Sequence, residues 1–249
     1  MTALIVVSDM PESSTSIPKY WAVVPAAGSG RRMASDIPKQ YLRLQGSTVL
    51  EHTLNALFAC ESIEGVVLAL SPGDDYWPGI APGFSGKNLV CVAGGEERCH
   101  SVLNALHHLR GFAAEHDWVL VHDAARPCVL AADITELIGT LAEDVCGGLL
   151  GVPVADTMKR LGADGRVSGT VDRQSVWHAQ TPQMFRLGLL RSALEQAIAR
   201  NRMVTDEASA MEMAGYRPCM VRGHADNIKI TVPSDLALAE FFLRGRDVA

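Results

Sequence analysis

The chain has 249 residues, of which 48% are hydrophobic and 20% are charged, a balance that is ordinary for a soluble globular enzyme. Its net charge of −6 argues against a general nucleic-acid binder, so the basic residues that matter should form local clusters. No apolar run approaches the roughly 20 residues that span a bilayer, and we expect neither nucleic acid nor membrane as a partner. The six cysteines include no Cys-x-x-Cys pair, which favours reduced core residues in a cytoplasmic protein.

Residues 1–19 are rich in Ser, Thr and Pro, and we expect a flexible extension before a folded domain of residues 20–245. Apolar runs within this domain predict strands at 22–24, 66–70, 89–92, 118–121, 149–154 and 227–230. Helical periods occur at 49–59, 101–109, 134–141, 187–200, 207–214 and 234–243. This alternation predicts an α/β, Rossmann-like fold, in which helices cover both faces of a mainly parallel, twisted sheet. The ligand of such a sheet lies beyond the carboxyl ends of its strands.

The segment Pro25-Ala-Ala-Gly-Ser-Gly-Arg-Arg-Met33 follows the first predicted strand. Its glycines, Gly28 and Gly30, let backbone N–H groups approach an anion without a Cβ in the way. The segment and the residues just after it add three cations: Arg31, Arg32 and Lys39. Fixed cations suit a triphosphate whose phosphorus is attacked. The third glycine of a dinucleotide fingerprint and the Gly-Lys-Ser/Thr of a P-loop are both missing.

A second polar segment, His122-Asp-Ala-Ala-Arg-Pro127, follows the predicted strand 118–121. Asp123 suits Mg²⁺, which takes one or two protein carboxylates and completes its shell with phosphate oxygens and water. The alternative interpretation is that Asp123 only caps a helix. Arg126 is close enough in sequence to hold a second anion, and we assign no role to His122.

Three further segments carry polar residues with open interpretations. Gly94-Gly95 permits close approach to a flat ligand, and Ser101 suits either a base edge or a helix cap. Lys229 belongs either to a polar cluster or to a solvated strand face, and Thr205 suits either a helix start or an anion contact.

Residues 155–173 are loop-rich and contain Asp164-Gly165, which predicts a β-hairpin. A hairpin of that size is marginal alone, so we expect a second subunit to support it.

Taken in this order, these segments strongly resemble the 2-C-methyl-D-erythritol 4-phosphate cytidylyltransferase family. The resemblance runs from Trp21 to about Leu243, and the matching segments are Pro25–Met33, Pro38-Lys-Gln-Tyr41, Gly94-Gly95…Arg98…Ser101-Val102, His122–Pro127, Asp156-Thr-Met-Lys159, Thr170-Val-Asp-Arg173, Trp177–Gln183, Thr205-Asp-Glu-Ala-Ser209 and Ala225–Thr231. It implies transfer of CMP from CTP to methylerythritol phosphate, with release of pyrophosphate, in the non-mevalonate isoprenoid route.

The resemblance also implies roles for individual residues. Arg32 and Lys39 would stabilise the pentacoordinate α-phosphate, and Lys229 would orient and neutralise it. Asp123 would bind Mg²⁺. CTP would contact Pro25, Ala26, Ala27, Gly28, Gly30, Arg32, Lys39, Gly94, Gly95, Ser101, Asp123 and Ala124. The sugar phosphate would contact Arg126, Thr157, Arg173, Thr205 and Lys229. Thr157 and Arg173 would come from a partner's dimerisation arm, formed by residues 155–173 of a homodimer.

Two other functions stay open on the sequence. A cytidylyltransferase of similar build could act on ribitol 5-phosphate or a related polyol phosphate, although the segments around Thr205 and Lys229 favour methylerythritol phosphate. A regulatory nucleotide-binding module without turnover is the other alternative. The cations around the presumed α-phosphate argue against it, because binding alone has little use for them.

Overall fold

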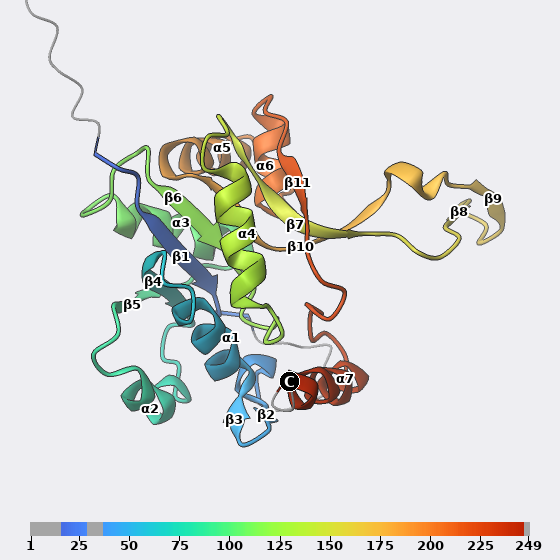
Figure 1. Cartoon of the computed structure of the whole chain (residues 1–249). Helices are drawn as coiled ribbons and strands as arrows, with labels where there is room; N and C mark the ends of the chain where they lie inside the picture. The colour runs from blue at the N-terminus through green and yellow to red at the C-terminus, as the bar shows by residue number, and fades with distance from the viewer. Residues whose placement is uncertain (1–15, 29–36, 247–249) are drawn as a thin grey trace, which may run out of the picture.

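The computed structural model describes residues 16–28 and 37–246. A seven-stranded sheet with the order β11-β7-β10-β6-β1-β4-β5 forms its centre (Figure 1). β10 runs antiparallel to both of its neighbours, and the other neighbouring pairs are parallel, which confirms the predicted mainly parallel sheet. The strands are β1 (Tyr20–Pro25), β4 (Ile63–Leu70), β5 (Leu89–Ala93), β6 (Trp118–Val121), β7 (Gly147–Pro153), β10 (Trp177–Arg186) and β11 (Cys219–Arg222).

Helices cover both faces of the sheet, and the alternation of side chains along β1 shows how. Ala22 and Val24 belong to one core with α1 and α4, whereas Trp21 and Val23 belong to a second core with α3, α5 and α6. Because both of their faces are buried, the central parallel strands β1 and β6 are apolar throughout, as the sequence predicted. The helix bounds are α1 (Val49–Phe58), α3 (Arg98–Leu109), α4 (Ala131–Leu141), α5 (Leu187–Ala199) and α6 (Glu207–Met213).

Smaller elements lie near the carboxyl ends of the parallel strands. A third, small core joins them through Leu44, Val49, Ala125, Cys128, Ile230 and Ala239. It packs α7 (Pro233–Arg246) against β2 (Arg43–Leu44), while β3 (Ser47–Thr48) pairs with β2 and η2 (Lys39–Tyr41) precedes them. The remaining short helices, α2 (Trp77–Ile80) and η3 (Ala81–Phe84), follow β4. Among the described residues, no helix is long and apolar enough to cross a membrane.

Residues between β7 and β10 form an arm that projects from the body (Figure 1). β8 (Lys159–Leu161) pairs antiparallel with β9 (Val167–Thr170), and η4 (Arg173–Ser175) follows. Gly165 in the connecting loop has φ +75°, a conformation that favours glycine. The arm carries large apolar side chains that are exposed, at Met158, Leu161 and Val167. The role of this arm in dimerisation stays a prediction.

The predicted strand at 227–230 is wrong, since the chain there has no regular structure. Asn227 is fully buried, and its side chain donates to the Thr181 carbonyl oxygen instead of pairing in a ladder. Two strands of the central sheet, β10 and β11, were not predicted, nor was the small pair β2 and β3. The polar residues of β10 suggest a loop, but Gln180 and Gln183 are buried and hydrogen-bonded to other segments.

Candidate active site

A cleft that is open to solvent lies at the carboxyl edge of the sheet. The turn after β1, the loop before α3, the loop after β6 and Lys229 together form its walls. Ten of the residues predicted to bind ligand line it: Pro25, Ala26, Ala27, Gly28, Lys39, Gly95, Ser101, Asp123, Ala124 and Lys229. The predicted residues Gly30 and Arg32 lie outside the described residues.

Gln40 ties the turn after β1 to η2. Its Nε2 donates to the carbonyl oxygens of Ala26 and Gly28, at 2.8 and 3.1 Å. The neighbouring Lys39 Nζ donates to the Ile230 carbonyl oxygen at 2.9 Å. The cation of Lys39 is therefore placed beside the turn by a short helix whose residues Lys39 and Gln40 both donate to neighbouring backbone. No role was predicted for Gln40 from the sequence.

Gly94 and Gly95 bring the loop before α3 close to the turn after β1. A Cβ on Gly94 would lie 2.3 Å from the Cβ of Ala27, so this approach requires glycine. The Ser101 hydroxyl accepts from the Gly95 N–H at 3.0 Å and donates to the Glu97 carbonyl oxygen at 3.3 Å. Ser101 therefore holds the shape of the loop across the first turn of α3.

Asp123 is the centre of the charges in the cleft. Its Oδ1 lies 2.9 Å from Arg98 Nε, and its Oδ2 lies 2.8 Å from Lys229 Nζ and 3.5 Å from Arg126 Nε. Burial alone would raise the pKa of Asp123, but Arg98, Lys229 and Arg126 together hold it well below its usual range. The carboxylate is therefore ionised at every physiological pH.

The backbone around Asp123 is fixed by buried polar groups. The Asp123 N–H donates to Thr181 Oγ1 at 3.1 Å, and the same hydroxyl lies 3.0 Å from His122 Nδ1. Burial lowers the pKa of His122 to about 4, so its imidazole is neutral at pH 7. Arg126 Nη1 donates to the Asn227 carbonyl oxygen at 2.7 Å, which joins the loop after β6 to the segment that carries Lys229.

Arg98 and Glu207 belong to this network, although no role was predicted for either from the sequence. Arg98 Nη1 and Nη2 donate to Glu207 Oε1 and Oε2 at 2.6 and 2.9 Å. Arg98 stands in the Gly94 segment and Glu207 in the Thr205 segment, so both lay within motifs already recognised. Their contact joins α3 to α6, a pairing of distant segments that no local pattern could indicate.

The remaining residues predicted to bind the sugar phosphate lie apart from the cleft wall. Thr157 and Arg173 are exposed residues of the arm, and Arg173 donates to the Ala155 carbonyl oxygen. Thr205 is exposed just before α6, where its N–H donates to Ser209 Oγ at 3.2 Å. None of the three lines the cleft of its own chain.

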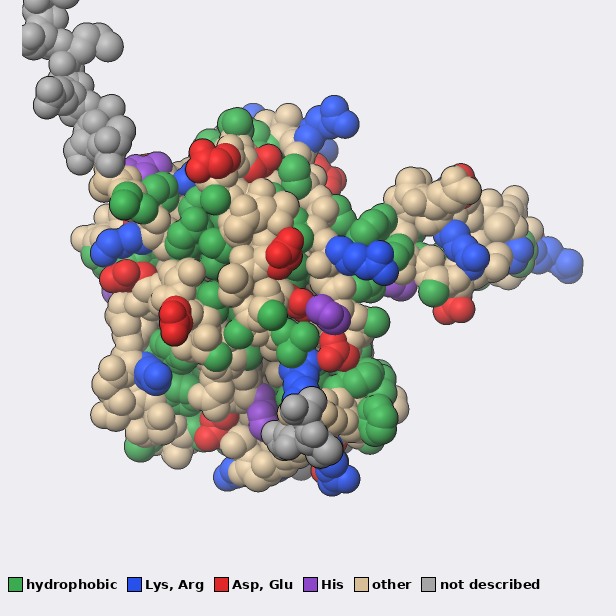
Figure 2. Space-filling model, in the orientation of Figure 1, with side chains coloured by type: hydrophobic (Ala, Val, Ile, Leu, Met, Phe, Trp, Pro, Cys, Tyr) green, Lys and Arg blue, Asp and Glu red, His purple; other side chains and the backbone are tan. Residues whose placement is uncertain are grey.

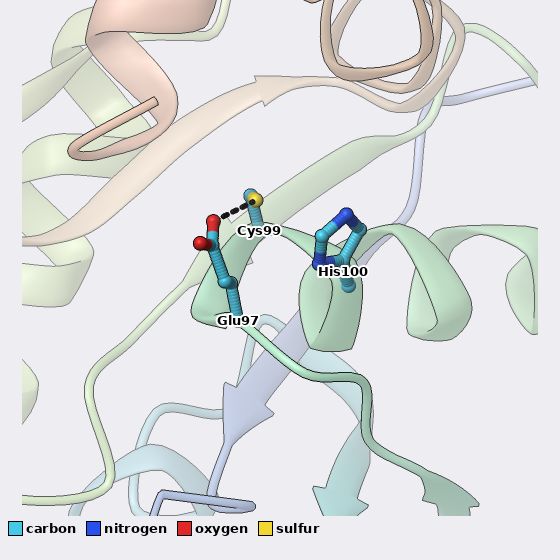
Figure 3. Close-up of side chains that lie close together, drawn as sticks. All are labelled: Glu97, Cys99 and His100. Atoms are coloured by element: carbon cyan, nitrogen blue, oxygen red, sulfur yellow. Dashed lines mark hydrogen bonds between the residues drawn. The ribbon is translucent and has the colours of Figure 1, made fainter. Parts of the chain in front are cut away.

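A second group of potential metal donors lies at the start of α3: Glu97, Cys99 and His100 (Figure 3). Their ligand atoms lie within 4.8 Å of one another. Burial, followed by the Glu97 charge, raises the pKa of the Cys99 thiol. The thiol donates to Glu97 Oε2 at 3.8 Å, as the dashed line shows. Because a metal needs the thiolate, this arrangement suits a hydrogen bond better than a metal ion.

Comparisons with known proteins match the whole described domain. The sequence model of the family described as "IspD: 2-C-methyl-D-erythritol 4-phosphate cytidylyltransferase" matches residues 20–245. A Hahella chejuensis protein named 2-C-methyl-D-erythritol 4-phosphate cytidylyltransferase is 55% identical over 226 residues, which cover 91% of this chain and 93% of that protein. A Pseudomonas entomophila protein of the same name is 52% identical over 225 residues, covering 90% and 95%.

Solved structures are similar over the same length. A crystal structure of 4-diphosphocytidyl-2C-methyl-D-erythritol synthase has a TM-score of 0.79 at 38% identity and covers 91% of this chain and 99% of its own. The Francisella tularensis 2-C-methyl-D-erythritol 4-phosphate cytidylyltransferase has a TM-score of 0.76 at 36% identity, covering 90% and 99%.

Proposed function

We propose roles for the cleft residues from the established family of the chain. The chain belongs to the 2-C-methyl-D-erythritol 4-phosphate cytidylyltransferase family, and it transfers a cytidylyl group from CTP to 2-C-methyl-D-erythritol 4-phosphate in isoprenoid biosynthesis. An oxygen of the acceptor phosphate forms a bond to the α-phosphorus of CTP, and the bond from that phosphorus to the bridging oxygen of the β-phosphate breaks. Pyrophosphate leaves with that bonding pair. The acceptor phosphate is already ionised near neutral pH, so the reaction needs no catalytic base.

The observation that carries the proposal is the ion-pair cluster of Asp123 with Arg98, Arg126 and Lys229 at a cleft that Lys39 also lines. The turn after β1 offers backbone N–H groups to the triphosphate, and the loop at Gly95 approaches closely enough to hold the base. We assign transition-state stabilisation to Lys39 and Lys229, together with Arg32. Catalysis then consists of positioning and charge stabilisation by groups that are in place before the reaction.

We propose Mg²⁺ as the cofactor, with Asp123 as its protein ligand. One ionised, buried carboxylate at the cleft wall fits a Mg²⁺ ion that takes its other ligands from phosphate oxygens and water. When bound, the ion supplies charge neutralisation at the triphosphate. Lys229 now contacts Asp123 Oδ2 and is one-third exposed, so this lysine has room to turn from the carboxylate to a phosphate.

We further propose a homodimer in which the arm of one protomer brings Thr157 and Arg173 to the partner's cleft, where Arg126 and Thr205 complete the sugar-phosphate site. The exposed apolar side chains of the arm support this, because they gain burial on a second copy. A cytoplasmic location is also proposed. All six cysteines are free in the structure, which suits a reducing compartment.

A pyrophosphate-release assay tests substrate choice and the role of Asp123 together. The purified chain is assayed with each of four nucleoside triphosphates, against methylerythritol phosphate and against ribitol 5-phosphate. We expect release with CTP and methylerythritol phosphate alone, dependent on Mg²⁺. In Asp123→Asn, added Mg²⁺ should no longer raise the rate of pyrophosphate release. The matched control is Asp164→Asn, since Asp164 is an exposed carboxylate of the arm loop. Equal rates with ribitol 5-phosphate would contradict the acceptor assignment.

A further inference from the structure

Three charged side chains are connected in series from the cleft wall into the protein. Asp123 contacts Arg98, and Arg98 contacts Glu207. Arg98 directs both terminal nitrogens to the two Glu207 oxygens, in a bidentate pair at 2.6 and 2.9 Å. Only its Nε is left for Asp123, which it contacts at 2.9 Å. Glu207 is fully buried, so Arg98 is bound on its inner side by a carboxylate that water does not reach.

Glu207 is itself held in place, because the start of α6 is anchored on β10. Gln183 donates from Nε2 to Asp206 Oδ2 at 2.9 Å and accepts from the Ala208 N–H at 2.8 Å. Asp206 and Ser209 close a reciprocal cap on the first turn of the helix. These contacts lie on both sides of Glu207 in the sequence. The carboxylate is therefore a fixed point rather than an adaptable partner.

The two oxygens of Asp123 consequently differ. Oδ1 is tied through Arg98 to this fixed point, while Oδ2 contacts Lys229, whose side chain is 36% exposed. The inner contact sets the orientation of the carboxylate, and the outer contact can change when a ligand arrives. Counting formal charges, three cations face the two carboxylates Asp123 and Glu207, so the cluster has a net charge of +1.

We propose that Glu207 is a positioning residue for cytidylyl transfer, which holds Arg98 so that Arg98 fixes the Asp123 carboxylate toward the metal–triphosphate. This inference rests on the proposed role of Asp123. Glu207 contacts neither substrate nor the reacting atoms. Removal of its charge leaves the cluster more positive, so metal-free CTP should bind at least as tightly, whereas the gain in CTP affinity from Mg²⁺ should fall.

The test uses Glu207→Gln in the full chain, because glutamine keeps the shape but loses the charge and one acceptor. Calorimetry without acceptor measures CTP binding with and without Mg²⁺, and steady-state assays measure kcat and both KM values. We expect kcat and the Mg²⁺ gain in CTP affinity each to fall about 10- to 100-fold, the range typical of outer-shell partners of a metal ligand. The matched control is Glu195→Gln. Glu195 is also paired with an arginine, Arg191, but it does not line the cleft.

A purely structural role would lower the melting temperature and leave the Mg²⁺ gain unchanged, and that result would overturn the proposal. Wild-type kcat together with a wild-type Mg²⁺ gain would overturn it as well. If Glu207→Gln does not fold, Arg98→Lys decides, since lysine keeps the charge but cannot bridge both carboxylates. A wild-type Mg²⁺ gain in that variant would refute the proposal, and loss of the gain would support it.

Two more variants separate this inference from the proposed function. In a double-mutant cycle, Arg98→Met with Glu207→Gln should be no worse than Arg98→Met alone, because Glu207 acts through Arg98. Additive losses would contradict that. If Asp123→Asn keeps the Mg²⁺ gain, the proposed role of Asp123 fails. If Asp123→Asn loses it while Glu207→Gln keeps it, only the positioning role of Glu207 fails.

Discussion

The cleft and the arm are built in opposite ways. Around the cleft, charged side chains are largely buried and are paired across three segments, as the contacts of Asp123 with Arg98, Arg126 and Lys229 show. In the arm, β8 and β9 pair with each other, and apolar side chains such as Leu161 and Val167 are about 60% exposed. Figure 2 shows the arm standing free of the body, with Lys and Arg side chains along it.

This difference indicates what each region needs. A charge-stabilising site must hold its groups in place before the substrate arrives, and the body of one chain supplies that rigidity. A two-stranded hairpin is marginal in water, so the arm needs another surface against which to pack. The cleft should therefore respond to changes of single charges, and the arm should respond to changes in self-association.

Replacing Lys39 by alanine should have the largest effect. Loss of one preorganised donor at the reacting phosphate typically costs about 10²- to 10³-fold in turnover. The fold should survive, since Lys39 is only partly buried and belongs to none of the hydrophobic cores. Turnover and melting temperature are measured beside Lys19→Ala, which removes an exposed lysine paired with Glu64. Near-wild-type turnover in Lys39→Ala would remove this residue from the mechanism.

Placing charges on the arm should separate the protomers. The double variant Leu161→Asp/Val167→Asp loses two apolar side chains, each worth about 1.5–3 kcal/mol if fully buried at an interface. We expect analytical ultracentrifugation to show a dimer for the wild type and a monomer for the variant, with unchanged melting of the body. Val145→Asp is the matched control, because Val145 is an exposed apolar residue outside the arm. A variant that stays dimeric would exclude the arm as the interface.

Arg173→Ala should mainly raise the KM for methylerythritol phosphate. A hydrogen bond to a charged group contributes about 1.5–3 kcal/mol, so the increase should be about 10- to 100-fold. The KM for CTP should stay near the wild-type value, because Arg173 is exposed in the arm and does not line the cleft of its own chain. Arg166→Ala, at an exposed arginine of the arm loop, is the control. Unchanged acceptor kinetics in Arg173→Ala would argue against a cross-subunit site.

The sequence predicted the sheet and most of the cleft because those features are local. Gly28 and Asp123 each follow a buried apolar strand, and the ends of parallel strands meet at one edge. The helices were predicted because their apolar faces repeat at the helical period, as in α1 and α4.

What the sequence could not show depends on contacts between distant segments. β10 looked polar, but Gln183 is buried because it anchors α6 through Asp206 and Ala208. The segment around Lys229 looked like a strand, but buried side-chain hydrogen bonds hold Asn227 in a loop instead. The link from Arg98 to Glu207 spans 109 positions, and neither residue by itself indicates its partner.

Acid should destabilise the buried region through His122. The unfolded chain binds a proton near the ordinary pKa of 6.5, whereas burial lowers the pKa of the folded His122 to about 4. Stability is therefore complete above pH 6.5 and is lost as the pH falls toward 4. Between pH 7 and pH 5 this linkage should lower the free energy of unfolding by about 2 kcal/mol.

Urea unfolding at pH 7 and at pH 5 measures this loss, and His122→Gln should abolish most of it because glutamine does not titrate. The comparison stops at pH 5 because the loss from Asp123 begins only near its ordinary pKa of 3.8. His178→Gln changes an exposed imidazole at the base of the arm and should keep the wild-type difference. If His122→Gln keeps it too, the pH response arises elsewhere, and the buried network around Asp123 does not set the acid stability of the body.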